Sequence, residues 1–345
     1  MGETDPKGLR GENKLMNTRT LQVFISQSQD PYFNLALEDY LFKNLLKNNL
    51  PVLFFYINQP SIIIGRAQNP WLECDLDLMV ENNILLARRQ SGGGAVYHDA
   101  GNLNYSILTP LNYFDKTLNL NLIKKSLGNF NIPEELISIG PRHDLWLNYK
   151  NTNYKFSGCA FRQSKDKAFH HGTLLIDASL SNLADYLRPS ELFKNPKNIN
   201  LEKIKGVKSV RSPVLNLSSL NPDLKNKIPE LIKKISVVFA RHWDLSPDFF
   251  SPLVGETGLE TEGLQDREGE KINLKEIQET QDYLQSFDWL YGKTLPFEIN
   301  KNIEIAKNNF IAVNLSIEAG LIKNIEPIDQ SLEYLLGQRF IKQFP

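Results

Sequence analysis

Strand-like segments that follow one another closely, with helical segments between the groups, most constrain how this chain can fold. Two candidate hairpins stand out. Gly94–His98 and Asn104–Leu108 flank the turn Asp99-Ala100-Gly101, and Asp144–Leu147 and Tyr154–Phe161 flank residues 148–153. Paired strands with helices between the pairs are typical of an α+β domain and not of a doubly wound parallel sheet. We therefore expect a large α+β domain with mainly antiparallel sheets flanked by helices.

Helical periodicity marks the segments that separate the strands. Asp30 and Pro31 suit a helix cap and a first helical position, and apolar residues recur at helical spacing over Pro31–Lys47. Leu118–Phe130 and Ser181–Leu187 are further predicted helices. The remaining strands of this region are predicted at Leu21–Ile25, Val52–Ile57, Ser61–Ile64, Ile84–Ala87 and Phe169–Ile176.

The chain divides at a stretch rich in Gly and Glu. Hydrophobic content falls across residues 251–271, which we interpret as a linker between a large domain (residues 21–250) and a small C-terminal α/β accessory domain (residues 272–345). The accessory domain is predicted to contain a helix at Leu274–Phe287, short strands and a closing helix. Residues 1–20 are polar and mix both charges, so we expect a disordered leader and neither a secretory nor a transit signal.

Composition excludes several classes of protein. The 39 basic residues nearly balance the 40 acidic ones, whereas general nucleic-acid binders have a basic excess or a basic face. The 2 cysteines, Cys74 and Cys159, form no CxxC pair, which argues against a disulfide-rich secreted fold and a cysteine-based zinc site. The sequence contains no run of the roughly 18 apolar residues that a membrane span needs. We expect a protein of a reducing compartment that binds neither nucleic acid nor membranes.

The segment Arg88-Arg89-Gln90-Ser91-Gly92-Gly93-Gly94-Ala95-Val96-Tyr97-His98-Asp99 is the most informative part of the chain. Three successive glycines allow positive φ angles and a close approach of the main chain to a ligand. Their N–H groups can converge on an anion, and Arg89 can supply a charged fork for a phosphate or a carboxylate. The segment matches neither a P-loop nor a dinucleotide-binding loop. The alternative is a glycine-rich hairpin with two solvated arginines.

A second segment, Tyr154-Lys155-Phe156-Ser157-Gly158-Cys159-Ala160, places a lysine inside a predicted strand. Strand alternation puts Tyr154 and Phe156 on one face and Lys155 and Ser157 on the other. An unpaired buried lysine is costly, so Lys155 either reaches solvent or meets an anion. Beside the glycine-rich segment, contact with a phosphate or an acyl carbonyl is the better interpretation.

Adjacent histidines occur in Phe169-His170-His171-Gly172-Thr173-Leu174-Leu175-Ile176. On a strand they face opposite ways and cannot share one metal ion without a bulge. The chain has 5 histidines in all and no HExxH motif. We therefore expect no metal bound by the protein alone, and a polar residue of this strand that buttresses the site.

Together these segments resemble the lipoate–protein ligase family, which includes the lipoyltransferases and belongs to the biotin/lipoate ligase superfamily. The resemblance lies in the run from Arg88 to Asp99, the Lys-Phe-Ser-Gly run at Lys155, the His-His-Gly-Thr-Leu-Leu run at His170, and Ser209-Val210-Arg211-Ser212. The four motifs occur in the order of the family across roughly Leu21–Leu217, and a weaker match continues at Phe287–Lys293.

The resemblance implies an enzyme that activates lipoate with ATP to lipoyl-AMP and transfers the lipoyl group to a lysine of lipoyl carrier domains. Residues 21–250 are then the catalytic domain. The implied catalytic residue is Lys155, which reaches the acyl carbonyl and the α-phosphate. The implied nucleotide-binding residues are Arg89, Gly92, Gly93, Gly94, Ala95, Val96, Tyr97, Asp144 and Lys155, and the implied lipoate-binding residues are Arg89, Gly94, Lys155 and His171.

The same resemblance implies the ligands and partners. The ligands are (R)-lipoate, ATP and Mg²⁺, the ion accompanying the nucleotide near Asp144. The partners are the lipoyl domains of 2-oxoacid dehydrogenase E2 subunits and the glycine cleavage H protein. The implied protein is a cytoplasmic monomer, with the mitochondrial matrix as the alternative location.

Several residues form a second rank of candidates. Arg66, Asn102 and Asn104 are possible pocket residues, with hydrogen bonding of hairpins and loops as the alternative. His143 stands where the resemblance implies an asparagine in bacterial ligases. An acyl chain needs an apolar tunnel. Leu35, Leu37 and the strand Ile62–Ile64 could supply part of this tunnel, but their sequence context favours a plain hydrophobic core.

Other functions stay open at this point. A lipoyl or octanoyl transferase would use a preformed acyl-AMP or another acyl donor, and Cys159 would then be a candidate nucleophile, although no histidine lies beside it in the sequence. A non-catalytic acyl-nucleotide-binding protein would leave its carrier domain unmodified. A biotin ligase fits less well, because its usual glycine-arginine loop differs from residues 89–94.

Overall fold

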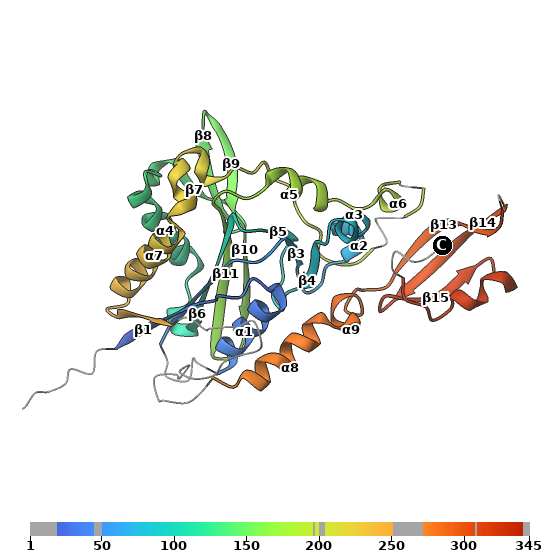
Figure 1. The fold of residues 1–345 in the computed structure, drawn as a ribbon, viewed down its shortest axis with the longest axis horizontal. Helices are drawn as coiled ribbons and strands as arrows, with labels where there is room; N and C mark the ends of the chain where they lie inside the picture. The colour runs from blue at the N-terminus through green and yellow to red at the C-terminus, as the bar shows by residue number, and fades with distance from the viewer. Residues whose placement is uncertain are drawn as a thin grey trace, which may run out of the picture.

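A computed structural model describes residues 19–44, 50–195, 197–199, 204–250, 272–307 and 309–340. A central six-stranded sheet is accompanied by three three-stranded sheets, one of them near the C-terminus at the far end of the molecule (Figure 1). The predicted leader falls outside the described residues except for residues 19 and 20, and the predicted linker falls wholly outside them. None of the described helices is both long and apolar enough to cross a membrane.

The central sheet has the strand order β10-β11-β6-β2-β1-β12. Its strands are β1 (Thr20–Ile25), β2 (Val52–Tyr56), β6 (Asn102–Pro110), β10 (Cys159–Gln163), β11 (Lys167–Leu175) and β12 (Ser246–Phe250). Strands β10, β11, β6 and β2 pair antiparallel, whereas β1 pairs parallel with both β2 and β12. The prediction of an α+β fold with mainly antiparallel sheets is confirmed.

Helices cover both faces of the central sheet (Figure 1). The longer ones are α1 (Pro31–Asn44), α4 (Lys116–Leu127), α7 (Ile228–His242) and α8 (Leu274–Gln285), and the shorter ones are α2 (Pro70–Glu73), α3 (Leu76–Glu81), α5 (Leu180–Tyr186), α6 (Glu191–Lys194) and α9 (Phe287–Leu290). Helices α4 and α7 lie on one face of the sheet, and α1 and α8 lie on the other.

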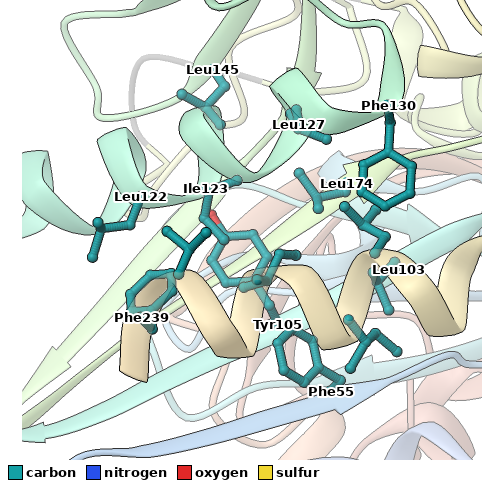
Figure 2. Packing of buried hydrophobic residues seen from close by; sticks show 14 of the residues in the cluster. Phe55, Leu103, Tyr105, Leu122, Ile123, Leu127, Phe130, Leu145, Leu174 and Phe239 are labelled. Carbon is teal, nitrogen blue, oxygen red and sulfur yellow. The ribbon is translucent and has the colours of Figure 1, made fainter. Parts of the chain in front are cut away.

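Strand β2 shows the consequence of this two-sided cover. All five of its residues are buried, as is typical of a strand covered on both faces. Leu53 and Phe55 pack in the cluster with α4 and α7, whereas Phe54 and Tyr56 pack in the cluster with α1 and α8. Figure 2 shows the first cluster, in which Phe239 of α7 lies beside the side chains of α4 and the sheet.

The first predicted hairpin is wrong. Strand β5 (Val96–His98) pairs antiparallel with β3 (Ser61–Ile64), which also pairs parallel with β4 (Leu85–Arg88), and β6 lies in the central sheet instead. The turn at Gly101 therefore carries the chain from one sheet to another. Its carbonyl accepts hydrogen bonds from the N–H groups of Ile176 and Asp177, both at 2.9 Å.

The second predicted hairpin forms, but its second strand ends earlier than we expected. Strand β8 (Leu145–Tyr149) pairs antiparallel with β9 (Thr152–Ser157) and with β7 (Ile137–Ile139). The prediction of one strand over Tyr154–Phe161 is wrong, because the chain leaves this sheet at Gly158 and enters the central sheet as β10. Lys155 and Cys159 thus belong to different sheets.

The C-terminal part has two portions. Helices α8 and α9, predicted as part of the accessory domain, contribute Ile277, Leu284 and Trp289 to the cluster that contains α1. Strands β13 (Phe297–Ala306), β14 (Asn309–Glu318) and β15 (Leu321–Glu326) form a separate antiparallel sheet. A 3-10 helix over Gln330–Leu335 takes the place of the predicted closing helix. The division of the chain into domains stays a prediction.

Candidate active site

The glycine-rich segment joins β4 to β5 and forms one wall of a cleft, which we call the glycine wall (residues 88–98). Gly93 has φ +91°, and a Cβ there would lie 2.9 Å from Arg89 Nη2. A Cβ at Gly65, at the end of β3, would lie 2.2 Å from the Gly93 carbonyl oxygen. These two positions accept glycine alone without rearrangement, because the main chain is left-handed at one and crowded at the other.

Arg89 fixes the shape of this loop from inside. Its side chain is buried, and Nη2 donates to the carbonyls of Gly92 and Gly94, both at 2.7 Å, while Nη1 donates to that of Ile63 at 2.9 Å. Burial lowers its pKa to about 10, so the guanidinium is charged at neutral pH. Direct contact of Arg89 with a ligand phosphate stays a prediction, because its guanidinium donates to the carbonyls of the loop and of Ile63 in β3.

Arg88 connects the same wall to the C-terminal part. Its buried guanidinium donates to the carbonyl of Leu290 at 2.6 Å, to that of Gln68 at 2.8 Å and to Thr294 Oγ1 at 3.1 Å. In return, Trp289 Nε1 donates to the Arg88 carbonyl at 2.7 Å. The alternative of two solvated arginines is therefore wrong for both.

Lys155 lies on the opposite wall, which we call the hairpin wall (residues 140–158). Its Nζ lies 3.0 Å from Asp144 Oδ2, and its side chain is 22% exposed. Its main chain is fixed by a third segment, because its N–H donates to the Pro213 carbonyl at 2.8 Å and its carbonyl accepts from Leu215 at 3.2 Å. The ammonium is therefore close to a carboxylate and still accessible from the cleft.

Asp144 remains ionised although it is buried. Burial opposes ionisation, but the neighbouring Trp146 indole and the Lys155 ammonium outweigh it and lower the pKa of Asp144 below 3.8. Among the described residues, neither carboxylate oxygen has a hydrogen-bond partner of good geometry. Such oxygens fit a Mg²⁺ ion that accompanies a nucleotide, since Mg²⁺ usually takes one or two carboxylates plus substrate phosphates. No group of three or more His, Cys, Asp or Glu in the described part of the chain is arranged to bind a metal.

His171 joins the glycine wall to helix α1. Its Nδ1 lies 2.9 Å from Glu38 Oε1, and its Nε2 lies 2.7 Å from Ser91 Oγ. Ser91 Oγ also accepts from Arg89 Nε at 3.1 Å. This network agrees with the expected buttressing role. Glu38 was absent from the sequence prediction, because nothing near it in the chain indicates its partner.

The cleft has two chambers that meet at Lys155. The first chamber has a volume of about 460 Å³ and the second of about 700 Å³. Lys155 lines both, as do Ala95, Val96, Thr173 and Ser209. A ligand with two parts can therefore occupy both chambers with its junction beside the ammonium.

Every residue of the predicted site lines this cleft. The first chamber is lined by Arg89, Gly92, Gly93, Gly94, Ala95, Val96, Asp144, Lys155 and His171. Tyr97 lines the second chamber, together with Ala95, Val96 and Lys155. The structure thus brings together residues from three separate sequence motifs, although the role of each stays a prediction.

The second-rank candidates divide. Asn104 lines the first chamber, whereas Asn102 lies behind it and donates to Asn104 Oδ1 at 3.0 Å. Arg66 is exposed and does not line the cleft. Of the predicted acyl-chain residues, Leu35 and Ile63 line the first chamber. The others, Leu37, Ile62 and Ile64, belong to the hydrophobic clusters.

Cys159 also lines the first chamber, but its environment favours the thiol. Its Sγ lies 3.3 Å from Tyr105 Oη, and burial raises its pKa to about 11 in spite of hydrogen bonding from Tyr105 and the charge of Lys155. A nucleophilic cysteine needs a lowered pKa. The geometry therefore argues against Cys159 as the nucleophile of an acyl transferase.

Comparison with known proteins identifies the family. A family model described as the lipoyl protein ligase A/B catalytic domain matches residues 30–240, more than half of the chain. This chain belongs to the lipoyl protein ligase A/B family. It is 36% identical over 306 residues to the lipoate-protein ligase A of Bdellovibrio bacteriovorus, covering 89% of this chain and 82% of that protein. It is 35% identical over 332 residues to the lipoate-protein ligase A of Psychrobacter cryohalolentis, covering 93% and 89%.

Solved structures of ligases have the same fold. The structure of LipL1 of P. falciparum in complex with lipoate gives a TM-score of 0.60 at 29% identity, covering 89% of this chain and 83% of that one. A lipoate-protein ligase A bound with ATP gives 0.56 at 20% identity, covering 79% and 98%. A bipartite ligase of Thermoplasma acidophilum, described with its E2 lipoyl domain, gives 0.58 at 24% identity, covering 79% and 96%. At these identities the last two show the fold alone.

Proposed function

We propose that this chain is a lipoate–protein ligase, which forms lipoyl-AMP from lipoate and ATP and transfers the lipoyl group to a lysine of a lipoyl carrier domain. Membership of the family and two bacterial relatives named lipoate-protein ligase A support the reaction. The observation that carries the proposal is the position of Lys155, which lines both chambers of the cleft beside Asp144.

The first chamber takes the acyl chain and the second takes the nucleotide. The first is closed by buried residues that include Leu35 and Ile63, as an acyl tunnel requires. The second has apolar walls from Leu175, Leu183 and Leu187, which suit the faces of a purine ring. This arrangement places the bond between the two parts of the ligand next to Lys155.

In the first step a carboxylate oxygen of lipoate attacks the α-phosphorus of ATP. The new O–P bond forms as the bond to pyrophosphate breaks, and the electron pair leaves with pyrophosphate. Negative charge develops on the α-phosphate oxygens, and preorganised cations and N–H groups stabilise such charge in a site that excludes water. Lys155 supplies the cation, and the main chain of Gly92, Gly93 and Gly94 supplies candidate N–H donors.

In the second step the neutral amine of the carrier lysine attacks the acyl carbonyl. A C–N bond forms, the bond to the AMP oxygen breaks, and the amine loses a proton to water. Lys155 polarises the carbonyl in this step too. The mixed anhydride is itself an activated acyl donor, so no covalent intermediate with the enzyme is needed.

Asp144 is proposed to bind the Mg²⁺ ion that ATP brings. The ion supplies charge neutralisation on the phosphates. Asp144 also orients Lys155 through the contact at 3.0 Å, which keeps the ammonium directed to the junction of the chambers.

The proposed acceptors are the lipoyl domains of 2-oxoacid dehydrogenase E2 subunits and the glycine cleavage H protein. A bipartite archaeal ligase of the same fold is described with its E2 lipoyl domain, which supports the first class of acceptor. We further propose a monomer that works in the cytoplasm.

A transferase that uses preformed lipoyl-AMP is the second candidate, because the same cleft would serve the second step alone. One experiment separates the possibilities. The purified protein is incubated with an apo lipoyl domain and either lipoate, ATP and Mg²⁺ or preformed lipoyl-AMP, and the acceptor is weighed by mass spectrometry. Lipoylation under both conditions supports the ligase, and lipoylation by lipoyl-AMP alone supports the transferase. An unmodified acceptor in both reactions would falsify both enzymatic functions.

A further inference from the structure

A histidine of the glycine wall has a fixed tautomer and an unpaired donor. His98 lies at the end of β5 and lines the first chamber. The residue is 3% exposed, and its Nδ1 lies 3.0 Å from Asn58 Nδ2. Among the described residues, its Nε2 is buried without a hydrogen-bond partner.

A chain of hydrogen bonds fixes the proton on Nε2. The backbone carbonyl of Ser28 can only accept, so the Asn34 side-chain atom 2.9 Å from it is the amide nitrogen. That nitrogen also donates to Asn58 at 2.8 Å, which makes the contacted atom of Asn58 its oxygen. The other polar atom of Asn58 is therefore its nitrogen, which donates to His98 Nδ1. A neutral imidazole that accepts at Nδ1 carries its hydrogen on Nε2.

The ring is neutral at ordinary pH. Burial, helped by the charge of Arg89, lowers the pKa of His98 to about 3. Burial disfavours the charged imidazolium in the folded state, so the ring gains its second proton only in strong acid. Nε2–H is thus a donor, and Nδ1 an acceptor, at neutral pH.

His98 belongs to the closed end of the first chamber. The residues that line this end are buried, as Leu35, Tyr56, Ile63 and Asn104 show with 2–5% exposure. The residues that line the other end include Val207 and Val210, which are 43% and 62% exposed. A chain whose carboxyl group lies beside Lys155 extends away from the open side into the closed end. This step rests on the proposed function.

We propose that His98 makes the site selective for an acyl group whose far end carries a weak hydrogen-bond acceptor, the sulfur of a dithiolane ring, over a plain hydrocarbon chain. The selectivity comes mainly from exclusion. A hydrocarbon that fills the closed end leaves the Nε2–H donor buried without a partner, and such a donor costs more free energy than an ordinary hydrogen bond gains. A sulfur atom accepts weakly and reduces that cost.

A pair of ligands with the same shape tests this on the unmodified protein. Lipoate is 5-(1,2-dithiolan-3-yl)pentanoic acid, and 5-cyclopentylpentanoic acid has carbon in place of both sulfurs. Isothermal titration calorimetry without ATP measures the affinity for each. We expect lipoate to bind about tenfold more tightly, which corresponds to about 1.4 kcal/mol. Equal affinities would overturn the proposal.

Two variants assign the preference to the N–H group. His98→Leu removes the donor and should reduce the ratio of the two affinities to near one, mainly through tighter binding of the carbocycle. His98→Gln supplies an amide N–H and should retain most of the ratio. The ratio is internal to each protein, so a general loss of affinity cancels. A His98→Leu variant that keeps the wild-type ratio would overturn the proposal.

A spectroscopic readout serves if the variants do not fold. The wild-type protein labelled with ¹⁵N at histidine should give an Nε2–H signal for His98. That signal should move downfield when lipoate is added and should not do so with the carbocycle. A protonated Nδ1, or a signal that responds equally to both acids, would contradict the assignment.

The role of His98 and the proposed ligase activity can be tested separately. Competition between lipoate and octanoate for transfer to an apo lipoyl domain is measured in parallel. Preferential binding of lipoate without any transfer would retain the role of His98 and remove the ligase activity. Equal affinities for lipoate and the carbocycle, together with equal transfer of lipoate and octanoate, would retain the activity and remove the role of His98.

Discussion

The glycine wall and the hairpin wall both contain cations, but they use them differently. Arg88 and Arg89 are buried, and their guanidinium groups donate to main-chain carbonyls. These hydrogen bonds hold the glycine wall in its shape. Lys155 is 22% exposed and contacts one carboxylate, so its charge remains available to a ligand. Cations in one site can therefore have separate tasks. One wall determines geometry, and the other supplies charge.

Replacing Lys155 should have the largest effect and tests the hairpin wall. Lys155→Met keeps the length of the side chain and removes the charge, so we expect kcat/KM for lipoylation to fall about a thousandfold or more. The protein should stay folded with a lower melting temperature, because buried Asp144 loses the ammonium that stabilises its charge. Lys165→Met, at an exposed lysine, is the matched control. Normal activity of the Lys155 variant would remove the central assignment.

Replacing Arg89 should affect stability as well as activity and tests the glycine wall. Arg89→Ala leaves the carbonyls of Ile63, Gly92 and Gly94 without their donors, so the free energy of unfolding should fall by about 3 kcal/mol. Displacement of the loop should lower kcat/KM about a hundredfold. Urea denaturation and steady-state kinetics measure the two effects.

The exposed Arg66→Ala is the control for this variant and should be close to wild type. If Arg89→Ala keeps wild-type stability and loses only affinity for ATP, the guanidinium contacts the phosphate directly. The contrast between the two walls would then be wrong.

Asp144→Asn sharpens the comparison by removing the partner of Lys155 while keeping its shape. We expect activity to fall about tenfold, with a weaker response to Mg²⁺. Because the pKa of Asp144 is lowered in the folded state, its ionisation stabilises the protein above its ordinary value of 3.8. This contribution should disappear as the pH falls through the lower folded-state pKa. Denaturation of the wild type and the variant from about pH 2 to about pH 7 measures this contribution as the difference between their free energies of unfolding. A difference that grows as the pH falls would contradict the prediction.

Cys159→Ala should have the smallest effect. The thiol has a pKa of about 11, so at pH 8 only about one molecule in a thousand carries the thiolate. Activity should stay within about twofold of wild type. Alkylation of Cys159 by iodoacetamide in the native protein should be slow at neutral pH and should accelerate toward pH 11. A variant without activity would revive the cysteine-dependent transferase.

Much of the site could be predicted because its signals are local. Gly93 and Lys155 are unusual for the segments in which they occur, and each belongs to a short motif. Glu38 and Arg88 could not be assigned in this way, since their partners lie 133 and 202 residues away in the chain. Nothing in the sequence around either residue distinguishes a buried bonding role from a solvated one.

The fold, too, could be predicted where its signals are local, and could not be predicted where segments far apart in the chain come together. Strands such as β2 and β11 were recognised from local patterns, but the pairing of β5 with β3 depends on contacts between distant segments. Helix α7 was missed although Leu231, Ile235 and Phe239 recur at helical spacing and pack in the core. The periodic signal for this helix is present in the sequence.

The exchange of hydrogen bonds between Arg88 and the segment Trp289–Leu290 has a consequence for how the molecule can be shortened. The family model ends at residue 240, which suggests a self-sufficient unit. A fragment cut there would remove two acceptors of the buried Arg88 guanidinium, the Leu290 carbonyl and Thr294 Oγ1, and would uncover the packing surface of α1. Residues 30–240 define the family, but we expect them to need the C-terminal helices α8 and α9 for full stability.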